Sequence, residues 1–146
     1  MIQLPVFKNL FSGFMFICSL VYSGTTVAQT VIGKWSQVTV KQYFTEDGAK
    51  KYGKPFIVTD MSTIGTVTSE FKSNHTYVTI SGRQDGSSRT YSGSWSLDGN
   101  VLTMTDEKAT AAVQSTVTIK SGVLVMETLH PESKITRKVE ITYKKV

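Results

Sequence analysis

Residues 89–105 read RTYSGSWSLDGNVLTMT, and this stretch decides the fold class. Its first half alternates two sets of side chains, one with Tyr91, Gly93, Trp95 and Leu97 and the other with Thr90, Ser92, Ser94 and Ser96. A period of two residues places the two sets on opposite faces of a β-strand, so that one face packs and the other meets water. The residues Asp98-Gly99-Asn100 then favour a tight hairpin turn. The stretch therefore predicts two antiparallel strands joined by a short connection.

The same pattern recurs along the chain after residue 30, and hardly any segment shows the 3.6-residue period of a helix. Turn residues separate the segments at 73–75, 85–88 and 121–122. The predicted strands are 31–44, 56–61, 63–72, 76–81, 89–97, 101–105, 111–120, 123–129 and 135–143. Eight or nine strands joined mostly by short turns favour a small antiparallel up-and-down β-barrel of about eight strands over a two-sheet sandwich. The fold class is all-β.

Two segments depart from this regularity. Residues 45–55, TEDGAKKYGKP, are too polar and glycine-rich for a core element, so we expect a surface loop there, suited to be a lid. In the first strand, Val38, Val40 and Phe44 lie out of phase with Trp35. A β-bulge near Ser36 would switch the phase, as bulges do where barrel strands bend.

The first 28 residues predict a secretory signal peptide. An apolar run at 10–22 follows Lys8, is too short to cross a membrane, and precedes the small residues Thr26-Val27-Ala28. We expect cleavage after Ala28, a barrel domain over residues 29–146, and a periplasmic or secreted protein. An uncleaved anchor and an ordinary buried helix are the alternatives. A lipoprotein acylated at Cys18 would need small residues before the cysteine, where Met15-Phe16-Ile17 stand instead.

Composition excludes several classes of protein. The chain has 146 residues, one Cys, two His and a net charge of +5, with its Lys and Arg scattered. Removal of residues 1–28 takes away the Cys and, with Lys8, one positive charge, which leaves 118 residues at +4. Disulfide scaffolds and zinc sites built from Cys and His are therefore excluded, and no element concentrates enough basic residues for nucleic-acid binding.

The sequence gives no support to an enzyme. It has no Gly-x-Ser-x-Gly elbow, and the predicted mature chain has no Cys nucleophile. The two histidines, His75 and His130, stand beside turn residues, and the adjacent acidic pairs do not form a dyad because neighbouring side chains on a strand point to opposite faces. We therefore predict a protein without catalysis, cofactor or metal.

Three patches resemble the bacterial lipocalin-like domain proteins, over about residues 32–143. They are Gly33-Lys34-Trp35 at the start of the first strand, residues 70–77 (EFKSNHTY), and residues 93–105 (GSWSLDGNVLTMT). The resemblance implies a lipocalin-type barrel in which Trp35 plugs the closed end and an Arg of the last strand stacks on it. Arg137 shares the phase of Ile135, Val139 and Ile141, so we expect it to point inward and meet Trp35, a carboxylate such as Glu70 or Glu127, or the head group of a ligand.

An eight-stranded barrel is just wide enough to be filled by its own side chains or to hold one small ligand. We therefore expect an exported protein that binds a small hydrophobic or amphiphilic molecule. The candidate lining is Trp35, Phe71, Tyr91, Trp95, Met104, Met126 and Arg137. Alternatively, these side chains could simply fill the hydrophobic core of the barrel.

Two other functions stay open. One is a protein-binding barrel, such as an exported hydrolase inhibitor that acts through loops 45–55 and 82–88. The other is adhesion to anionic envelope polymers through Lys50, Lys51, Lys54, Lys144 and Lys145. Sequence does not fix the oligomeric state.

Overall fold

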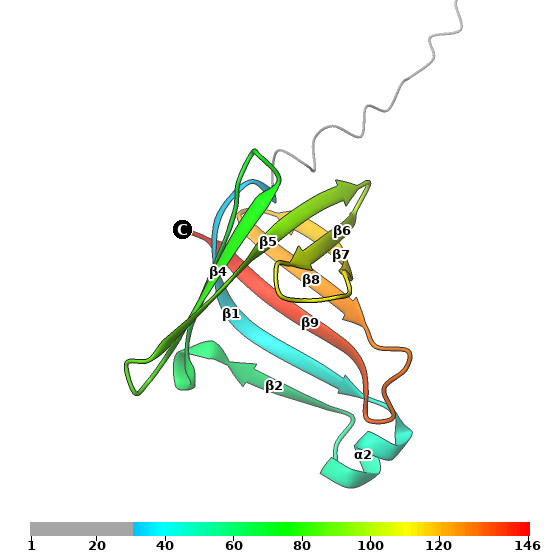
Figure 1. Ribbon diagram of the computed structural model, residues 1–146. Helices are drawn as coiled ribbons and strands as arrows, with labels where there is room; N and C mark the ends of the chain where they lie inside the picture. The colour runs from blue at the N-terminus through cyan, green and yellow to red at the C-terminus, as the bar shows by residue number, and fades with distance from the viewer. Residues whose placement is uncertain (1–30) are drawn as a thin grey trace, which may run out of the picture.

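The computed structural model of the protein describes residues 31–146, and the predicted signal peptide lies outside these residues. Within them the chain forms nine strands, one α-helix and one 3-10 helix (Figure 1). In chain order these are β1 (Gly33–Phe44), α2 (Glu46–Tyr52), β2 (Phe56–Asp60), η1 (Met61–Thr63), β3 (Gly65–Phe71), β4 (Thr76–Arg83), β5 (Ser88–Asp98), β6 (Val101–Asp106), β7 (Val113–Lys120), β8 (Val123–Leu129) and β9 (Thr136–Lys145). All nine predicted strands are confirmed.

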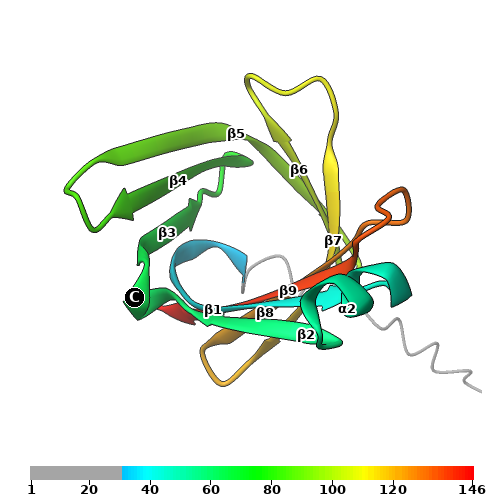
Figure 2. The ribbon, with the colours of Figure 1, turned by 90° about the horizontal axis from the view of Figure 1, so that it is seen from below.

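The strands close into a barrel. Neighbours in the sheet follow the order β2-β1-β3-β4-β5-β6-β7-β8-β9, and β1 also pairs with β9. Every pairing is antiparallel. Eight strands make the closed wall, while β2 pairs only with β1. Figure 2, seen from below, shows the wall surrounding the interior. The predicted up-and-down barrel is confirmed.

Strand β1 is shared among three neighbours. Its residues 33–36 pair with β3, and its residues 39–43 pair on the same edge with β2. On the other edge, Gln37 and Thr39 pair with the consecutive residues Tyr143 and Thr142, which leaves Val38 as an extra residue. The predicted bulge is present, two residues after the expected position. It turns Val40 and Gln42 toward the interior, where Trp35 also points.

The two ends of the barrel are built differently. At one end the turns are short, as at Ser121-Gly122, where φ values of 51° and 74° give the left-handed conformation that a tight hairpin needs. Trp35 lies near this end, which we call the closed end. The long connections 45–64, 107–112 and 130–135 lie at the other end, the mouth.

The prediction of a surface loop at residues 45–55 is wrong in part. Residues 46–52 form the helix α2 and not a loop. Thr45 begins the helix by accepting a hydrogen bond from the Gly48 amide, and Gly53 ends it with a φ of 68°. Gly48 fits closely against the mouth, since a Cβ there would lie 2.3 Å from the Ile135 carbonyl oxygen. The stretch is polar because the short helix sits on the rim.

Candidate functional site

The closed half of the barrel is filled by large side chains. Trp35, Phe71, Leu102 and Leu124 expose 1% or less of their surface. The indole N–H of Trp35 donates to the Val31 carbonyl at 2.8 Å, so the chain that precedes β1 closes this end. Such a core is packed too densely for a ligand.

Two more aromatic side chains complete this packing. Trp95 lies edge-on to Phe71, with ring centroids 5.9 Å apart, and its indole N–H donates to the backbone oxygens of Lys72 and Thr76. Tyr143 is 6% exposed, and burial raises the pKa of its hydroxyl to about 12, although a hydrogen bond with Ser69 opposes the rise. All polar atoms of these rings are satisfied, as stable burial requires.

The mouth half has a different lining. Its inward side chains mix apolar groups with hydroxyls, and most are half-buried or exposed. Tyr91 keeps 44% of its surface exposed and Val113 keeps 53%, although both share the phase of buried neighbours on their strands. The half-buried members are Val40, Gln42, Val67, Thr79, Ser81, Met104, Thr128 and Val139. The interior therefore reaches solvent in this half of the barrel.

Polar side chains form pairs across the inner wall. Ser69 and Thr79 lie 2.8 Å apart across β3 and β4. Ser115 and Thr128 lie 2.7 Å apart across β7 and β8, and Ser115 is 4% exposed. In the Ser115–Thr128 pair one proton bridges the two oxygens and the other stays free to donate, whereas Ser69 also has a hydrogen bond with Tyr143. The mouth half can thus hold an apolar group and still satisfy a polar atom.

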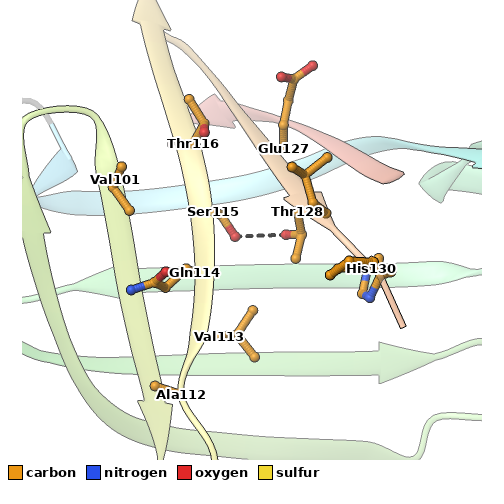
Figure 3. A pocket seen from close by; sticks show the side chains of 11 residues that line it. Val101, Ala112, Val113, Gln114, Ser115, Thr116, Glu127, Thr128 and His130 are labelled. Atoms are coloured by element: carbon orange, nitrogen blue, oxygen red, sulfur yellow. Dashed lines mark hydrogen bonds between the residues drawn. The ribbon is translucent and has the colours of Figure 1, made fainter. Parts of the chain in front are cut away.

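The wall is open near the mouth between β7 and β8. A groove of about 600 Å³ lies there (Figure 3). Its lining is Val101, Ala112, Val113, Gln114, Ser115, Thr116, Glu127, Thr128, Leu129, His130 and Pro131. A second groove of about 300 Å³ lies beside β5 and β6, and it is lined by Arg89, Thr90, Tyr91, Ser92, Asp106, Glu107 and Lys108. The first is the larger and more apolar of the two.

The sequence-predicted residues fall into three groups. Trp35, Phe71, Trp95 and Met126 belong to the buried core, while Met104 packs against that core and is half-buried. Tyr91 lies in the mouth half, so the structure places only Met104 and Tyr91 of the predicted set where a ligand would have room. A ligand-binding role stays a prediction for all of them.

The prediction that Arg137 points into the barrel is wrong, because its side chain is exposed. In the β1–β9 register, Tyr43 pairs with Lys138 and Phe44 pairs with Thr136, so Arg137 is the extra residue of a bulge in β9. Register places Lys145 opposite Trp35, and the Lys145 ammonium lies 5.6 Å from the centre of that ring. A cation does stack on Trp35 as the family resemblance implies, but a lysine at the strand end supplies it.

Lys138, and not Arg137, forms the ion pair with a carboxylate that the sequence suggested. Its ammonium lies 2.7 Å from Glu127 and 3.8 Å from Glu140 on the outer face of the barrel. The hydrogen bond between Lys138 and Glu127 raises the pKa of Lys138 and lowers the pKa of Glu127. This pair ties β8 to β9 beside the larger groove.

Sequence reasoning missed Ser69, Thr79, Ser115 and Thr128. A signal was present for Ser115, since it shares the phase of the apolar residues Val113 and Val117 on the same strand. We expected hydroxyls to mark the wet face of each strand. In this barrel they also line the interior.

Other predicted features can be compared directly. His75 and His130 are both exposed, as expected. The five lysines proposed to bind anionic polymers do not share a face, because Lys50, Lys51 and Lys54 lie at the mouth and Lys144 and Lys145 lie at the closed end. Residues 31–146 hold no cluster of three His, Cys, Asp or Glu side chains that could bind a metal. No helix within those residues is both long and apolar enough to cross a membrane.

A closed eight-stranded antiparallel barrel with one plugged end is the architecture of lipocalin-type proteins, which can hold one small ligand. The lipocalin-like domain family matches residues 31–126, and the chain belongs to that family. No curated protein matches the sequence.

Solved structures with the same fold are distant in sequence. A lipocalin-like protein from Bacteroides uniformis is 15% identical, with a TM-score of 0.54 over 80% of this chain and 98% of that chain. Apocrustacyanin C1 is 11% identical, with a TM-score of 0.53 over 84% of this chain and 64% of that chain. An uncharacterized protein from Bacteroides eggerthii is 13% identical, with a TM-score of 0.51 over 79% of this chain and 98% of that chain. These likenesses show the fold alone.

Proposed function

We propose that the protein is an exported, non-catalytic binder of a small hydrophobic or amphiphilic molecule, which it holds in the mouth half of the barrel. One observation carries the proposal. In the closed half, Trp35, Phe71 and Leu124 expose 1% or less of their surface, whereas in the mouth half Val113 and Tyr91 keep 53% and 44% exposed. Exposed apolar groups inside a barrel favour a ligand that covers them.

The lining suggests how such a ligand is held. Val67, Met104 and Val139 face inward and are half-buried, so they would contact an apolar chain or ring. Ser81 and Tyr91 lie on the inner face of β4 and β5 toward the mouth, where they would donate to a polar group. The molecule would therefore enter apolar end first, with its polar group left near solvent.

Binding can be tested with Nile red, an uncharged dye that fluoresces in apolar surroundings. The full chain is expected to bind the dye, and native mass spectrometry of protein from its own host is expected to show a bound small molecule. Met104→Lys, which places a charge on the inner wall, is expected to abolish dye binding. Ile80→Lys is the matched control, since Ile80 is 49% exposed on the outer phase of β4.

Two results would reject the proposal. One is a folded wild-type protein that carries no molecule and takes up no dye. The other is a Met104→Lys variant that is folded, as judged by its melting temperature, and binds the dye as well as Ile80→Lys does.

Export is part of the proposal and has its own test. The apolar run at 10–22 and the small residues before position 29 support cleavage after Ala28. Sequencing the amino terminus of the purified protein is expected to give Gln29 first. An intact Met1 terminus would contradict this expectation.

A protein-binding role is the second candidate. Tyr52, Phe56, Val58 and Ile64, on α2, on β2 and before β3, expose between 41% and 54% of their surface. Exposed apolar side chains of this kind often mark protein contacts. Deleting residues 45–55 would be a poor test because α2 packs on the rim. Val58→Asp is better: loss of a protein partner with unchanged dye binding would favour this role.

A further inference from the structure

The groove between β7 and β8 is a notch in the barrel wall. Backbone pairing of these strands runs from Lys120–Val123 at the closed end to Thr116–Glu127 and stops there. Strand β7 continues to Val113 and strand β8 to Leu129, each still paired with its other neighbour. Residues 113–115 and 128–129 therefore face each other without a ladder. We call this region the β7–β8 notch.

The notch joins the inside of the barrel to the outside. Val113, Ser115 and Thr128 belong to the inner face, since they share the phase of buried Val117 and Met126. Val101, Gln114, Glu127 and Leu129 belong to the outer face, and all seven residues line the same groove. A groove bounded by residues of both faces crosses the wall. Figure 3 shows the two ribbons diverging beside Ser115 and Thr128.

One side-chain contact bridges the notch. The Ser115 and Thr128 hydroxyls are 2.7 Å apart, and no backbone pair accompanies them in the β7–β8 register. A single hydroxyl bond contributes about 1 kcal/mol, far less than a ladder of backbone bonds. The wall can therefore open at this point at small cost.

The borders of the notch are apolar. Leu129 keeps 69% of its surface exposed, Val113 keeps 53% and Val101 keeps 37%. Among the described residues that line the groove, none is Lys or Arg, and Glu127 is the acidic one. This composition suits an uncharged amphiphile better than an anionic one. The groove beside β5 and β6 is different, because Arg89, Asp106, Glu107 and Lys108 line it and Ser92 donates to Glu107 across it.

We infer that the β7–β8 notch is the passage by which an uncharged amphiphile enters and leaves the barrel, with the Ser115–Thr128 hydrogen bond as its latch. The inference rests on the proposed function. A molecule that slides through a notch keeps its polar group outside the wall while its apolar part passes between Val113 and Leu129. It therefore avoids the desolvation of that polar group.

A disulfide can close the latch reversibly. In Ser115→Cys with Thr128→Cys, two sulfur atoms replace oxygens that lie 2.7 Å apart, near the S–S bond length of about 2.0 Å. Cys18 is the single cysteine of the sequence, so Cys18→Ser in the full chain removes every competing thiol. Disulfide formation is checked by mass before each measurement.

The control is a second pair of the same kind. The Ser69 and Thr79 hydroxyls lie 2.8 Å apart on β3 and β4, which are paired from Gly65–Arg83 to Phe71–Tyr77. Ser69→Cys with Thr79→Cys thus crosslinks a part of the wall that is already continuous. Any effect of thiol chemistry or of added stability would appear in both variants.

Stopped-flow fluorescence with Nile red measures the exchange. The oxidised 115–128 variant is expected to slow both association and release about tenfold or more with little change in Kd, since closing a passage alters rates and not the bound state. Reduction is expected to restore the rates, and the oxidised 69–79 control is expected to exchange at the rates of its own reduced form. Thr128→Val, which keeps the shape but removes the latch, is expected to exchange faster.

The outcomes separate the two proposals. If the wild type binds no dye, the proposed function fails and the passage fails with it. If the dye binds but its exchange is unchanged by the 115–128 disulfide, or is slowed equally by both disulfides, only the passage is wrong. Should the 115–128 pair not fold, an exchange rate of Thr128→Val equal to or below that of the wild type would overturn the inference.

Discussion

The closed half and the mouth half of this barrel are built on the same strands but treat their inward side chains in opposite ways. At the closed end Trp35 is 1% exposed and its indole is satisfied by a backbone carbonyl. Toward the mouth, Tyr91 and Val113 on the same inner surface are 44% and 53% exposed. One continuous wall can therefore combine a dense core, which supplies stability, with an accessible lining that is free for binding.

The largest expected difference between the halves is in stability. Trp35→Ala is expected to lower the free energy of unfolding by about 3–5 kcal/mol, because it removes a buried aromatic side chain and leaves a cavity. Tyr91→Ala in the mouth half is expected to lower it by less than about 1 kcal/mol. Urea unfolding followed by circular dichroism measures both. Similar losses for the two variants would contradict the division of the barrel.

Tyr143 predicts how the closed half responds to alkaline pH. Burial raises the pKa of its hydroxyl from 10.0 to about 12, so the neutral form stabilises the fold fully below pH 10. This stabilisation is lost as pH rises from 10 through 12, a loss of about 3 kcal/mol at 1.36 kcal/mol for each unit of pKa difference.

Tyr143→Phe cannot ionise, so its free energy of unfolding is expected to fall less between pH 10 and pH 12. The interpretation of the closed half is wrong if Tyr143→Phe follows the wild-type profile.

A smaller loss of stability is expected when Thr45 on the rim is replaced. The Thr45 hydroxyl accepts from the Gly48 amide at 3.2 Å and donates to the Lys134 carbonyl, so it begins α2 and fixes the helix to the connection before β9. Thr45→Ala is expected to lower the free energy of unfolding by about 1 kcal/mol. Thr118→Ala, on the exposed outer face of β7, serves as the control. Equal losses in thermal unfolding would argue against the cap.

The smallest effect is expected beside the notch. Glu127 is paired with Lys138 at 2.7 Å, but its side chain is 40% exposed, so solvent screens the pair. Glu127→Gln is expected to cost less than about 1 kcal/mol at pH 7.

The pH dependence of that variant follows from the lowered pKa of Glu127. The stabilisation is present above the ordinary pKa of a glutamate and disappears as pH falls through the lower folded value. The difference between Glu127→Gln and the wild type should therefore shrink as pH falls below the ordinary pKa of a glutamate.

Much of the fold could be predicted from the sequence because alternation is a local signal. The set Tyr91, Gly93, Trp95 and Leu97 does lie on one face of β5, and the turn at 98–100 joins β5 to β6. The bulge in β1 could be predicted because the phase of its apolar residues changes along the strand. These features depend only on residues near one another in the chain.

The site was harder to predict because it depends on register between strands. Arg137 has the inward phase when β9 is counted residue by residue, but a bulge opposite Tyr43 and Phe44 turns it out. The notch follows from where β7–β8 pairing stops, which no pattern within either strand reveals. The helix α2 escaped notice because seven residues are too few to show a helical period.

A ligand that occupies the mouth half is expected to leave the closed half unchanged. Methionine-methyl NMR tests it directly, since Met104 is half-buried near the mouth and Met126 is 6% exposed in the core. On titration with submicellar 1-monododecanoylglycerol, the Met104 methyl signal is expected to shift while the Met126 signal stays in place. A Met126 signal that shifts as much as that of Met104, or no shift of either at saturating lipid, would contradict the account.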